Sequence, residues 1–402
     1  MQKLALWGLL ATPLAFAALP LYIHLPHYYG ETLHISLTTL GLVLLLTRLF
    51  DAITDPWIGR FVDLLFTVKQ SWLWPSILLA ASFLMLGFYL LWHPLNPNAA
   101  LFWPYTVFAL LLTYLGYSAL TLIHQAWGVR FSGSVSFRAK LNATREAYTL
   151  LGVVTAAALP ALLTSLPIGT PLVILLFALL CIALYGLRQQ PPSDLPTTAA
   201  QRTASIPSPW RLSSFRHLAL IYALGGLASS WTATLMPFYV SRLISHNQST
   251  FAIYLLLYFA SAALSMPLWL VLIRRFGLKN CWLAGSVLSL VSFMLVYLLP
   301  TPYRLLGFGL VCIATGMAVA TDLVVPTSLL TGLIAKCGLT GLVEGQFLGW
   351  WVLVQKLSLA FAAGLALFAL GQTDALVALY VFVPLVLKGL AIAALLIYPT
   401  RE

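Results

Sequence analysis

The stretch 48-RLFDAITDP-56 places three charged side chains inside a long apolar run. In a helix, Arg48, Asp51 and Asp55 are spaced i, i+3 and i+7, so they share one face, with the two carboxylates one turn apart. Because ionised carboxylates are costly in hydrocarbon and repel each other, one must be protonated, paired with Arg48, or bridged by a cation. We therefore predict a site for a proton or a small hard cation such as Na+ at Asp51 and Asp55, with Arg48 as ion-pair partner. The alternative is that the two acids only neutralise Arg48 and join this helix to a neighbour.

The chain around these charges is strongly apolar. Its 402 residues are 61% hydrophobic and 8% charged, and the mean hydropathy is +0.95, which excludes a soluble core with a polar surface. Apolar stretches of about 20 residues, the length of a membrane-crossing helix, recur along the whole chain. We predict an all-α integral membrane protein with twelve transmembrane helices, at roughly 4–25, 36–60, 74–93, 100–126, 141–164, 168–187, 217–243, 250–273, 280–299, 303–333, 345–370 and 376–398.

A segment rich in Pro, Ser and Thr, 188–216, divides these spans six and six. It is typical of a flexible linker, so we predict an N-terminal half at 1–187, a cytoplasmic linker at 188–216 and a C-terminal half at 217–402. Each half repeats a cue after its second helix, and parallel repeats of this kind are found in transporters. The architecture resembles the major facilitator superfamily, with two six-helix pseudo-repeats. The residues of the two cues, which we expect to act in gating, are Gly59, Asp63, Arg274, Arg275 and Lys279.

The net charge of +11 is explained by where the basic residues lie. They gather in the even-numbered turns between the predicted spans, which is the positive-inside pattern. This places both termini in the cytoplasm and leaves no charge for a nucleic acid to explain. The short turns on the other side favour a bacterial inner membrane, and we expect a monomer in the lipid bilayer. The four cysteines lack paired spacing and are interpreted as apolar fillers.

The pattern Arg-x-x-Asp-Ala-x-x-Asp-Pro-x-x-Gly at 48–59 resembles the second helix of the glycoside–pentoside–hexuronide:cation symporter family, of which the melibiose permease is typical. In that family the two aspartates hold the coupling cation, which implies the same role for Asp51 and Asp55. The segments 124-HQAWGVRF-131, 138-RAKLNATREAYTLLG-152 and 344-EGQFLGWW-351 extend the resemblance over most of the chain.

Two departures from that family put a galactoside substrate in doubt. The stretch 10-LATPLAFAALP-20 has no charge where the permease carries an adjacent Lys-Asp pair. An acid expected in the fourth helix is also absent, and the nearest polar residues are Tyr117, Thr121 and His124. We add Thr121 to the cation site, and for His124 a coupling or substrate role and simple packing both remain open.

Other charged residues in the spans are candidates for the solute path. Lys356, in the middle of the eleventh span, resembles the family's cavity lysine, and Asp322 is a candidate ion-pair partner for it, switchable or static. For Arg145 the resemblance implies a cavity role, whereas a cytoplasmic anchor is the simpler explanation. Lys388 has no acid nearby in sequence and receives no assignment.

Aromatic side chains next to these motifs are candidates for stacking on a sugar ring, although most Trp and Tyr in membrane proteins are interfacial anchors or packing. The three we choose are Tyr117, Trp127 and Trp350.

These features together indicate a secondary transporter, not an enzyme. We expect cation-coupled symport of a sugar, glycoside or related small polar solute by alternating access, with no cofactor besides the coupling Na+ or H+. A membrane enzyme would need an acid or His-Asp constellation at a membrane face, whereas the close acids here lie mid-helix beside an arginine. A lipid or amphiphile carrier, favoured by the uncharged first helix, and a proton-coupled exporter remain alternatives.

Overall fold

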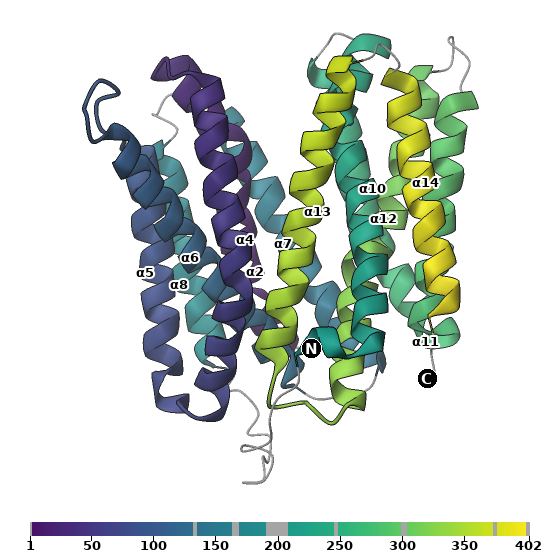
Figure 1. Ribbon diagram of the computed structural model, residues 1–402, viewed down its shortest axis with the longest axis horizontal. Helices are drawn as coiled ribbons and strands as arrows, with labels where there is room; N and C mark the ends of the chain where they lie inside the picture. The colour runs from purple at the N-terminus through teal and green to yellow at the C-terminus, as the bar shows by residue number, and fades with distance from the viewer. Residues whose placement is uncertain are drawn as a thin grey trace. The chain divides into compact units, whose positions relative to one another are not determined.

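The computed structural model describes residues 2–131, 135–162, 169–189, 208–244, 248–298, 304–372 and 376–398. All regular elements in these ranges are helical (Figure 1). Most of the predicted linker, residues 190–207, lies outside the described residues. The longer helices are α1 (Gln2–Gly8), α2 (Ala11–Leu19), α4 (Leu37–Thr67), α5 (Leu73–Trp92), α6 (Phe102–Val129), α7 (Val135–Leu162), α8 (Gly169–Arg188), α10 (Ser213–Leu243), α11 (Gln248–Leu298), α12 (Arg304–Lys336), α13 (Glu344–Gln372) and α14 (Leu376–Ile397). Short helical turns are η1 (Pro20–His24), α3 (Leu25–His27), η2 (Tyr28–Thr32), η3 (Gln70–Trp72) and η4 (Pro209–Arg211).

Each of the twelve predicted spans coincides with described helix. The first corresponds to α1 and α2, and the eighth and ninth both lie in α11, which has 51 residues. A straight helix of that length would measure about 77 Å, far more than the ~30 Å hydrocarbon core of a bilayer. It is broken at Gly277, whose φ of 81° and ψ of 168° suit a residue without a Cβ. Among the described residues, eight helices are long and apolar enough to cross a membrane, and the chain is a multi-pass membrane protein.

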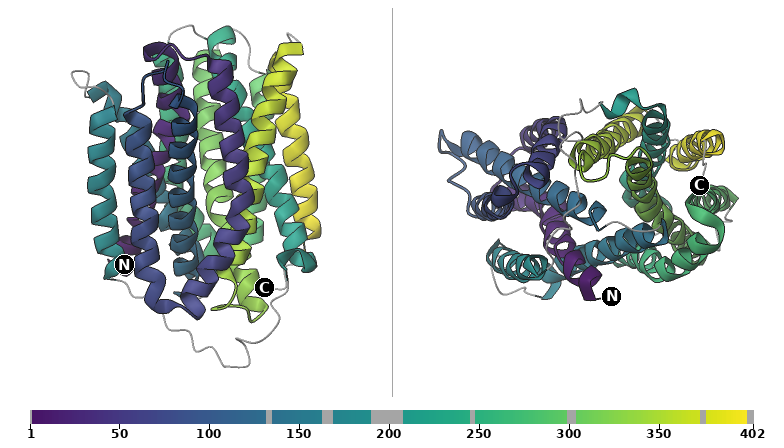
Figure 2. Two further views of the ribbon diagram at one scale, coloured as in Figure 1. Left: turned by 60° about the vertical axis from the view of Figure 1, so that its left-hand side comes forward. Right: turned by 90° about the horizontal axis from the view of Figure 1, so that it is seen from below.

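The chain forms two compact units, and the first contains most of the N-terminal half. It spans Met1–Ser132, Thr144–Ile206 and Cys337–Leu353. Within it α6 packs against both α4 and α5, while α8 packs against α2 and α5 (Figure 2). The segment Cys337–Leu353, which includes the start of α13, belongs to this unit although it comes from the C-terminal part of the sequence.

The second unit comprises Gly133–Ala143, Pro207–Lys336 and Val354–Glu402. Here α11 packs along α12, and α14 packs against α10 and α11. An aromatic cluster forms part of its core: the ring of Tyr239 stacks on those of Tyr380 and Phe308, with centroids 4.4 and 5.2 Å apart. The Asn142 side chain donates a hydrogen bond to Ser328 Oγ at 2.8 Å, which joins the start of α7 to α12 in this unit.

Candidate functional site

The two aspartates of α4 are buried, as their helical spacing predicted. Asp51 is 7% exposed and Asp55 is fully buried, and both lie in the middle of α4, which continues through Pro56. Ser118, on α6, donates a hydrogen bond from its hydroxyl to Asp51 Oδ1 at 2.7 Å. Both acids are therefore buried in protein, and Asp51 lies at the contact between α4 and α6.

Hydroxyl groups of α6 extend the oxygen-rich surface beside these acids. Thr121 lies three residues after Ser118, hence on the same face of the helix, and its Oγ1 is buried without a hydrogen-bond partner among the described residues. Within the same ranges, no group of three or more His, Cys, Asp and Glu side chains is placed to hold a metal ion. A cation at this site would thus rely on two carboxylates together with hydroxyl oxygens, which are ligands for hard cations.

Arg48, one turn before Asp51, points its Nε toward the hydroxyl of Tyr114 on α6, at 3.4 Å. This contact places the guanidinium at the same helix pair as the acids. The ion pair between Arg48 and the two aspartates stays a prediction.

Beyond the acids, α4 crosses the start of α13 at very short range through glycines. A Cβ added to Gly59 would lie 2.1 Å from the carbonyl oxygen of Gly345, and one added to Gly349 would lie 2.5 Å from that of Asp55. Small residues spaced four apart, here Gly345 and Gly349, allow two helix backbones to approach this closely. This Gly-x-x-x-Gly spacing can be read in the sequence at 345–349, and it is a signal from which the close crossing could have been predicted.

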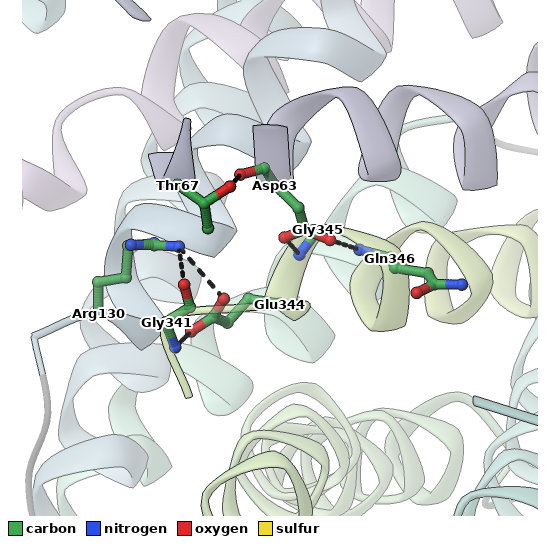
Figure 3. A network of polar contacts seen from close by, with 7 residues as sticks. All are labelled: Asp63, Thr67, Arg130, Gly341, Glu344, Gly345 and Gln346. Carbon is green, nitrogen blue, oxygen red and sulfur yellow. Dashed lines mark hydrogen bonds and ion pairs between the residues drawn. The ribbon is translucent and has the colours of Figure 1, made fainter. Parts of the chain in front are cut away.

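Asp63 caps the N-terminus of α13 from a different helix (Figure 3). The backbone amides of Gly345 and Gln346 donate to its two carboxylate oxygens at 2.6 and 2.8 Å. A carboxylate satisfies the free amides of a first helical turn and interacts favourably with the helix dipole. The segment from Gly59 to Asp63 therefore has two structural roles. Gly59, which lacks a Cβ, lets the α13 backbone approach closely, and Asp63 caps the N-terminus of α13.

Arg130, directly after α6, completes this network (Figure 3). Its Nη2 donates to the carbonyl oxygen of Gly341 at 2.9 Å and forms an ion pair with Glu344 at 3.5 Å. The Glu344 carboxylate in turn accepts the amide of Gly341. Burial lowers the pKa of Arg130, and the negative charges of Glu344 and Asp63 oppose that shift. In the sequence Arg130 lies in the segment 124-HQAWGVRF-131, and its partner Glu344 lies 214 positions away, so spacing could not predict the pair.

The matching cue in the second unit makes a different contact. Lys279 donates from Nζ to the carbonyl oxygens of Leu396 and Tyr398, at 3.0 and 2.7 Å, at the C-terminal end of α14. A cation is favourable there because the last carbonyls of a helix lack intrahelical donors. The guanidinium of Arg275 lies over the ring of Phe276, and Arg274 is exposed. The gating role of these three basic residues stays a prediction.

The structure corrects the ion pair considered for Asp322 and Lys356. Asp322 pairs instead with Lys388 of α14, whose side chain is 2% exposed. The indole of Trp282, on α11, donates to the other carboxylate oxygen at 2.8 Å. The physical reason is rotational: α12 turns the Asp322 carboxylate toward Trp282 of α11 and Lys388 of α14.

His124 and Trp127 occupy packed positions on α6. His124 Nε2 donates to the carbonyl oxygen of Trp7 at 2.9 Å, and the Trp7 indole donates back to the His124 carbonyl oxygen. Trp127 is fully buried, with edge contacts to Phe66 and Trp74. These contacts favour the packing interpretation of both residues.

The remaining candidates are partly buried, and their contacts with solute stay predictions. Arg145 donates from Nε to the carboxylate of its neighbour Glu146 at 3.1 Å. Tyr117, Trp350 and Lys356 each retain some exposed surface.

Among the described residues the protein is a helical, multi-pass membrane protein with buried acids on one long helix. The chain belongs to the family described as MFS/sugar transport protein, whose model matches residues 5–399. It is therefore a transporter and not an enzyme.

Solved structures of transporters share this fold. A bacterial homologue of the iron transporter ferroportin, in an outward-facing state, is 15% identical, with 99% of this chain and 98% of that chain covered and a TM-score of 0.76. The transporter FucP, in the outward conformation, is 13% identical with both chains fully covered and a TM-score of 0.69. At these identities the likeness shows the fold alone. Comparison with curated protein sequences finds no match.

Proposed function

We propose that the protein is a secondary active transporter that couples the movement of a cation, Na+ or H+, to that of a sugar, glycoside or related small polar solute. The observation that carries this proposal is the burial of Asp51 and Asp55 together on α4. The Ser118 hydroxyl is bonded to Asp51, and the buried Thr121 hydroxyl lies on the same face of α6 as Ser118. Two neighbouring buried carboxylates bind a proton or a hard cation more readily than they stay ionised together. The matching family description, sugar transport, supports the solute class.

Coupling follows from thermodynamic linkage. A cation that raises the affinity for solute must itself be held more tightly when solute is bound. In alternating access both ligands bind a central site while the two halves move around it. Loss of the cation site is then expected to remove the ion dependence of uptake without preventing the protein from folding.

The contact between α4 and α13 supplies a gate in this proposal. Asp63 lies eight residues after Asp55, about 12 Å along the same helix, and binds the first amides of α13. By the positive-inside pattern this end is cytoplasmic. The cap closes the inward mouth in one state of the cycle and must break in the other.

Transport by the purified protein in proteoliposomes tests the coupling. Uptake of labelled sugars is measured with an inward Na+ gradient, an inward proton gradient, or neither. Asp51→Asn and Asp55→Asn are expected to lose the stimulation by the gradient, and Ser118→Ala to weaken it. Thr113→Val is the matched control, since this buried α6 hydroxyl only bonds the carbonyl of Ala109. Gradient-stimulated uptake that survives in both aspartate variants would contradict the proposal.

A lipid or amphiphile carrier is the second candidate. Residues Ala11–Ala17 of α2 are all buried and uncharged, where the resembled sugar symporters carry charges. Binding of lysolipid alone, without any cation dependence, would favour that function or a proton-coupled exporter over sugar symport.

We further propose that the protein works as a monomer in a bacterial inner membrane, with both termini in the cytoplasm and with the solute and the bilayer as its partners. The charge distribution supports this orientation. Labelling of single cysteines introduced at the two termini, in inverted and in intact vesicles, tests this orientation. Cytoplasmic termini are expected to react with a membrane-impermeant reagent in inverted vesicles only.

A further inference from the structure

The second unit gathers basic side chains at one of its ends. At this end α10 begins, α11 breaks at Gly277, α12 ends and α14 ends. The basic residues there are Arg138, Lys140, Arg211, Arg216, Arg274, Arg275, Lys279 and Lys336. Among the residues that the structure describes in this unit, Asp322 is the one acid, and it lies within α12, paired with Lys388. Carboxylates of the described chain therefore do not balance the positive charge at this end.

In the first unit, by contrast, two basic side chains have acidic partners. Arg130 forms an ion pair with Glu344, and Arg145 forms one with Glu146. The positive-inside bias applies to a multi-pass membrane protein as a whole, so it does not by itself predict a difference between two units. The excess of cations in the second unit indicates a partner of negative charge.

Four exposed arginines form the accessible part of this charge, and we call them the arginine patch. Arg211 and Arg216 lie at the start of α10, and Arg274 and Arg275 lie on α11 just before its break. Both helices pack against α14, and Lys279 holds the C-terminal end of α14 against α11. Within the described part of the chain, none of the four arginines forms an ion pair.

Exposed apolar side chains lie directly beside the patch. Leu220 lies one turn after Arg216 and Val271 one turn before Arg275, and the two are 52% and 61% exposed. Phe276 is 50% exposed, and the guanidinium of Arg275 lies over its ring at 5.3 Å. In a membrane protein, such apolar surface contacts acyl chains, and cationic groups at its border lie at the depth of the lipid headgroups.

This combination of charge and apolar surface fits a phospholipid. Guanidinium groups bind phosphate through two parallel hydrogen bonds, and basic clusters beside membrane spans attract anionic lipids. A zwitterionic headgroup carries its own cation next to the phosphate, whereas phosphatidylglycerol carries none. A soluble anion or an acidic peptide would use the arginines but not the apolar surface beside them.

We propose that the arginine patch binds the headgroup of an anionic phospholipid, with the phosphate against the guanidinium groups and an acyl chain along the apolar side chains of α10 and α11. The inference goes beyond the proposed transport function and does not depend on it. The proposed orientation of the chain would place this lipid in the cytoplasmic leaflet.

Native mass spectrometry of the delipidated full-length protein in detergent measures bound lipid without any transport. The probes are dioleoyl phosphatidylglycerol, phosphatidylethanolamine and phosphatidylcholine, which share their acyl chains and differ in the headgroup. Phosphatidylglycerol is expected to bind more tightly than the two zwitterionic lipids. The difference is expected to shrink as salt rises, because exposed charges are screened. Equal affinity for the three lipids would overturn the proposal.

Paired substitutions test the arginine patch itself. Arg274→Gln/Arg275→Gln and Arg211→Gln/Arg216→Gln are each expected to weaken the binding of phosphatidylglycerol. A basic side chain near an anionic lipid surface changes the affinity about fivefold, so each pair is expected to lose about 25-fold if the two effects add. Binding of phosphatidylcholine by the same samples is expected to stay unchanged. An equal loss for both lipids would show that the headgroup charge is not recognised, and would contradict the proposal.

The matched control removes two exposed cations from the first unit. Arg60→Gln/Lys69→Gln changes the net charge by the same amount as each patch variant, and both side chains are exposed. Affinity for phosphatidylglycerol is expected to stay at the wild-type value. A loss equal to that of the patch variants would show attraction by net charge alone, and would refute the assignment to the arginine patch.

Soluble anions are tested as competitors for the bound lipid. Glycerol 3-phosphate presents a phosphate without acyl chains, and a hexaglutamate peptide presents carboxylates. Neither is expected to displace phosphatidylglycerol when added at the same concentration as the lipid. Displacement by either one would show that the patch is a site for soluble anions, and the assignment to a lipid would be wrong.

Discussion

Removal of the Asp63 carboxylate tests the gate most directly. In Asp63→Ala the amides of Gly345 and Gln346 lose acceptors at 2.6 and 2.8 Å. A hydrogen bond to a charged group contributes about 1.5–3 kcal/mol, and loss of an N-cap costs about 0.5–2 kcal/mol. Because both bonds share one carboxylate, they do not add fully, and we take about 2–4 kcal/mol for the pair.

The loss of this free energy is expected to shift the equilibrium between the closed and open states of the inward mouth. If the cap exists only while the inward mouth is closed, its loss lowers the ratio of closed to open states about 30-fold to 700-fold. The maximal transport rate is then expected to fall, since the closed state becomes rare. The intrinsic affinity for solute is expected to change little, because Asp63 contacts α13 and not the proposed solute sites.

Uptake kinetics in proteoliposomes separate rate from affinity, and alkylation of a cysteine introduced at position 343 reports on the gate. Val343 is fully buried and directly precedes α13, so alkylation of Val343→Cys is expected to accelerate when Asp63→Ala is added. Thr67→Val is the matched control: it removes a hydroxyl that bonds the backbone oxygen of Asp63 but keeps the carboxylate. Wild-type rate and wild-type labelling in Asp63→Ala would refute the gate. An effect confined to solute affinity would refute it equally.

Three further substitutions probe packing and charge. Gly349→Ala is expected to lower the thermal unfolding temperature, because the added Cβ would lie 2.5 Å from the backbone of α4. Gly364→Ala on the same helix is the control, since its Cβ would meet nothing within 4 Å. Equal unfolding temperatures for the two variants would argue against the close crossing. Lys388→Met leaves the partly buried Asp322 carboxylate without its cation and is expected to cost less than the ~3–5 kcal/mol of a fully buried pair. Most of that cost is expected to be recovered in the double variant with Asp322→Asn, and no recovery would show that the pair is not the source. His124→Phe removes one hydrogen bond and is expected to cost about 1 kcal/mol while the ion dependence of uptake stays unchanged; altered ion dependence would return His124 to the coupling site.

The sequence predicts helices and faces well because those depend on local periodicity. The spans follow from apolar runs of about 20 residues, and the shared face of Asp51 and Asp55 follows from the geometry of one helix. Both predictions required no knowledge of a partner. The Gly-x-x-x-Gly spacing of Gly345 and Gly349 was equally local, and it would have indicated a close helix crossing.

Residue spacing in the sequence could not predict which residues, far apart in the chain, contact each other. Asp63 binds amides 282 and 283 positions later, and nothing in its own neighbourhood identifies α13. For Asp322, hydropathy gave the depth of both Lys356 and Lys388 in the membrane but not the direction in which α12 turns its carboxylate. Two lysines at similar depth were therefore indistinguishable, and the structure selects Lys388.

The position of Pro56 explains how the acids and the gate can communicate along α4. Proline has no backbone N–H, so the carbonyl of Ala52 lacks its helical hydrogen bond, and the helix is easiest to bend at this turn. Asp51 precedes that turn and Asp55 lies within it, whereas Gly59 and Asp63 follow it. A cation bound to the two carboxylates would change the local charge at the turn that Pro56 weakens. The contact of Asp63 with the N-terminus of α13 holds the part of α4 that follows this turn. Because both sites act on the same helix, we expect cation binding at the acids to change the free energy of the cap, and loss of the cap to change the affinity for the cation.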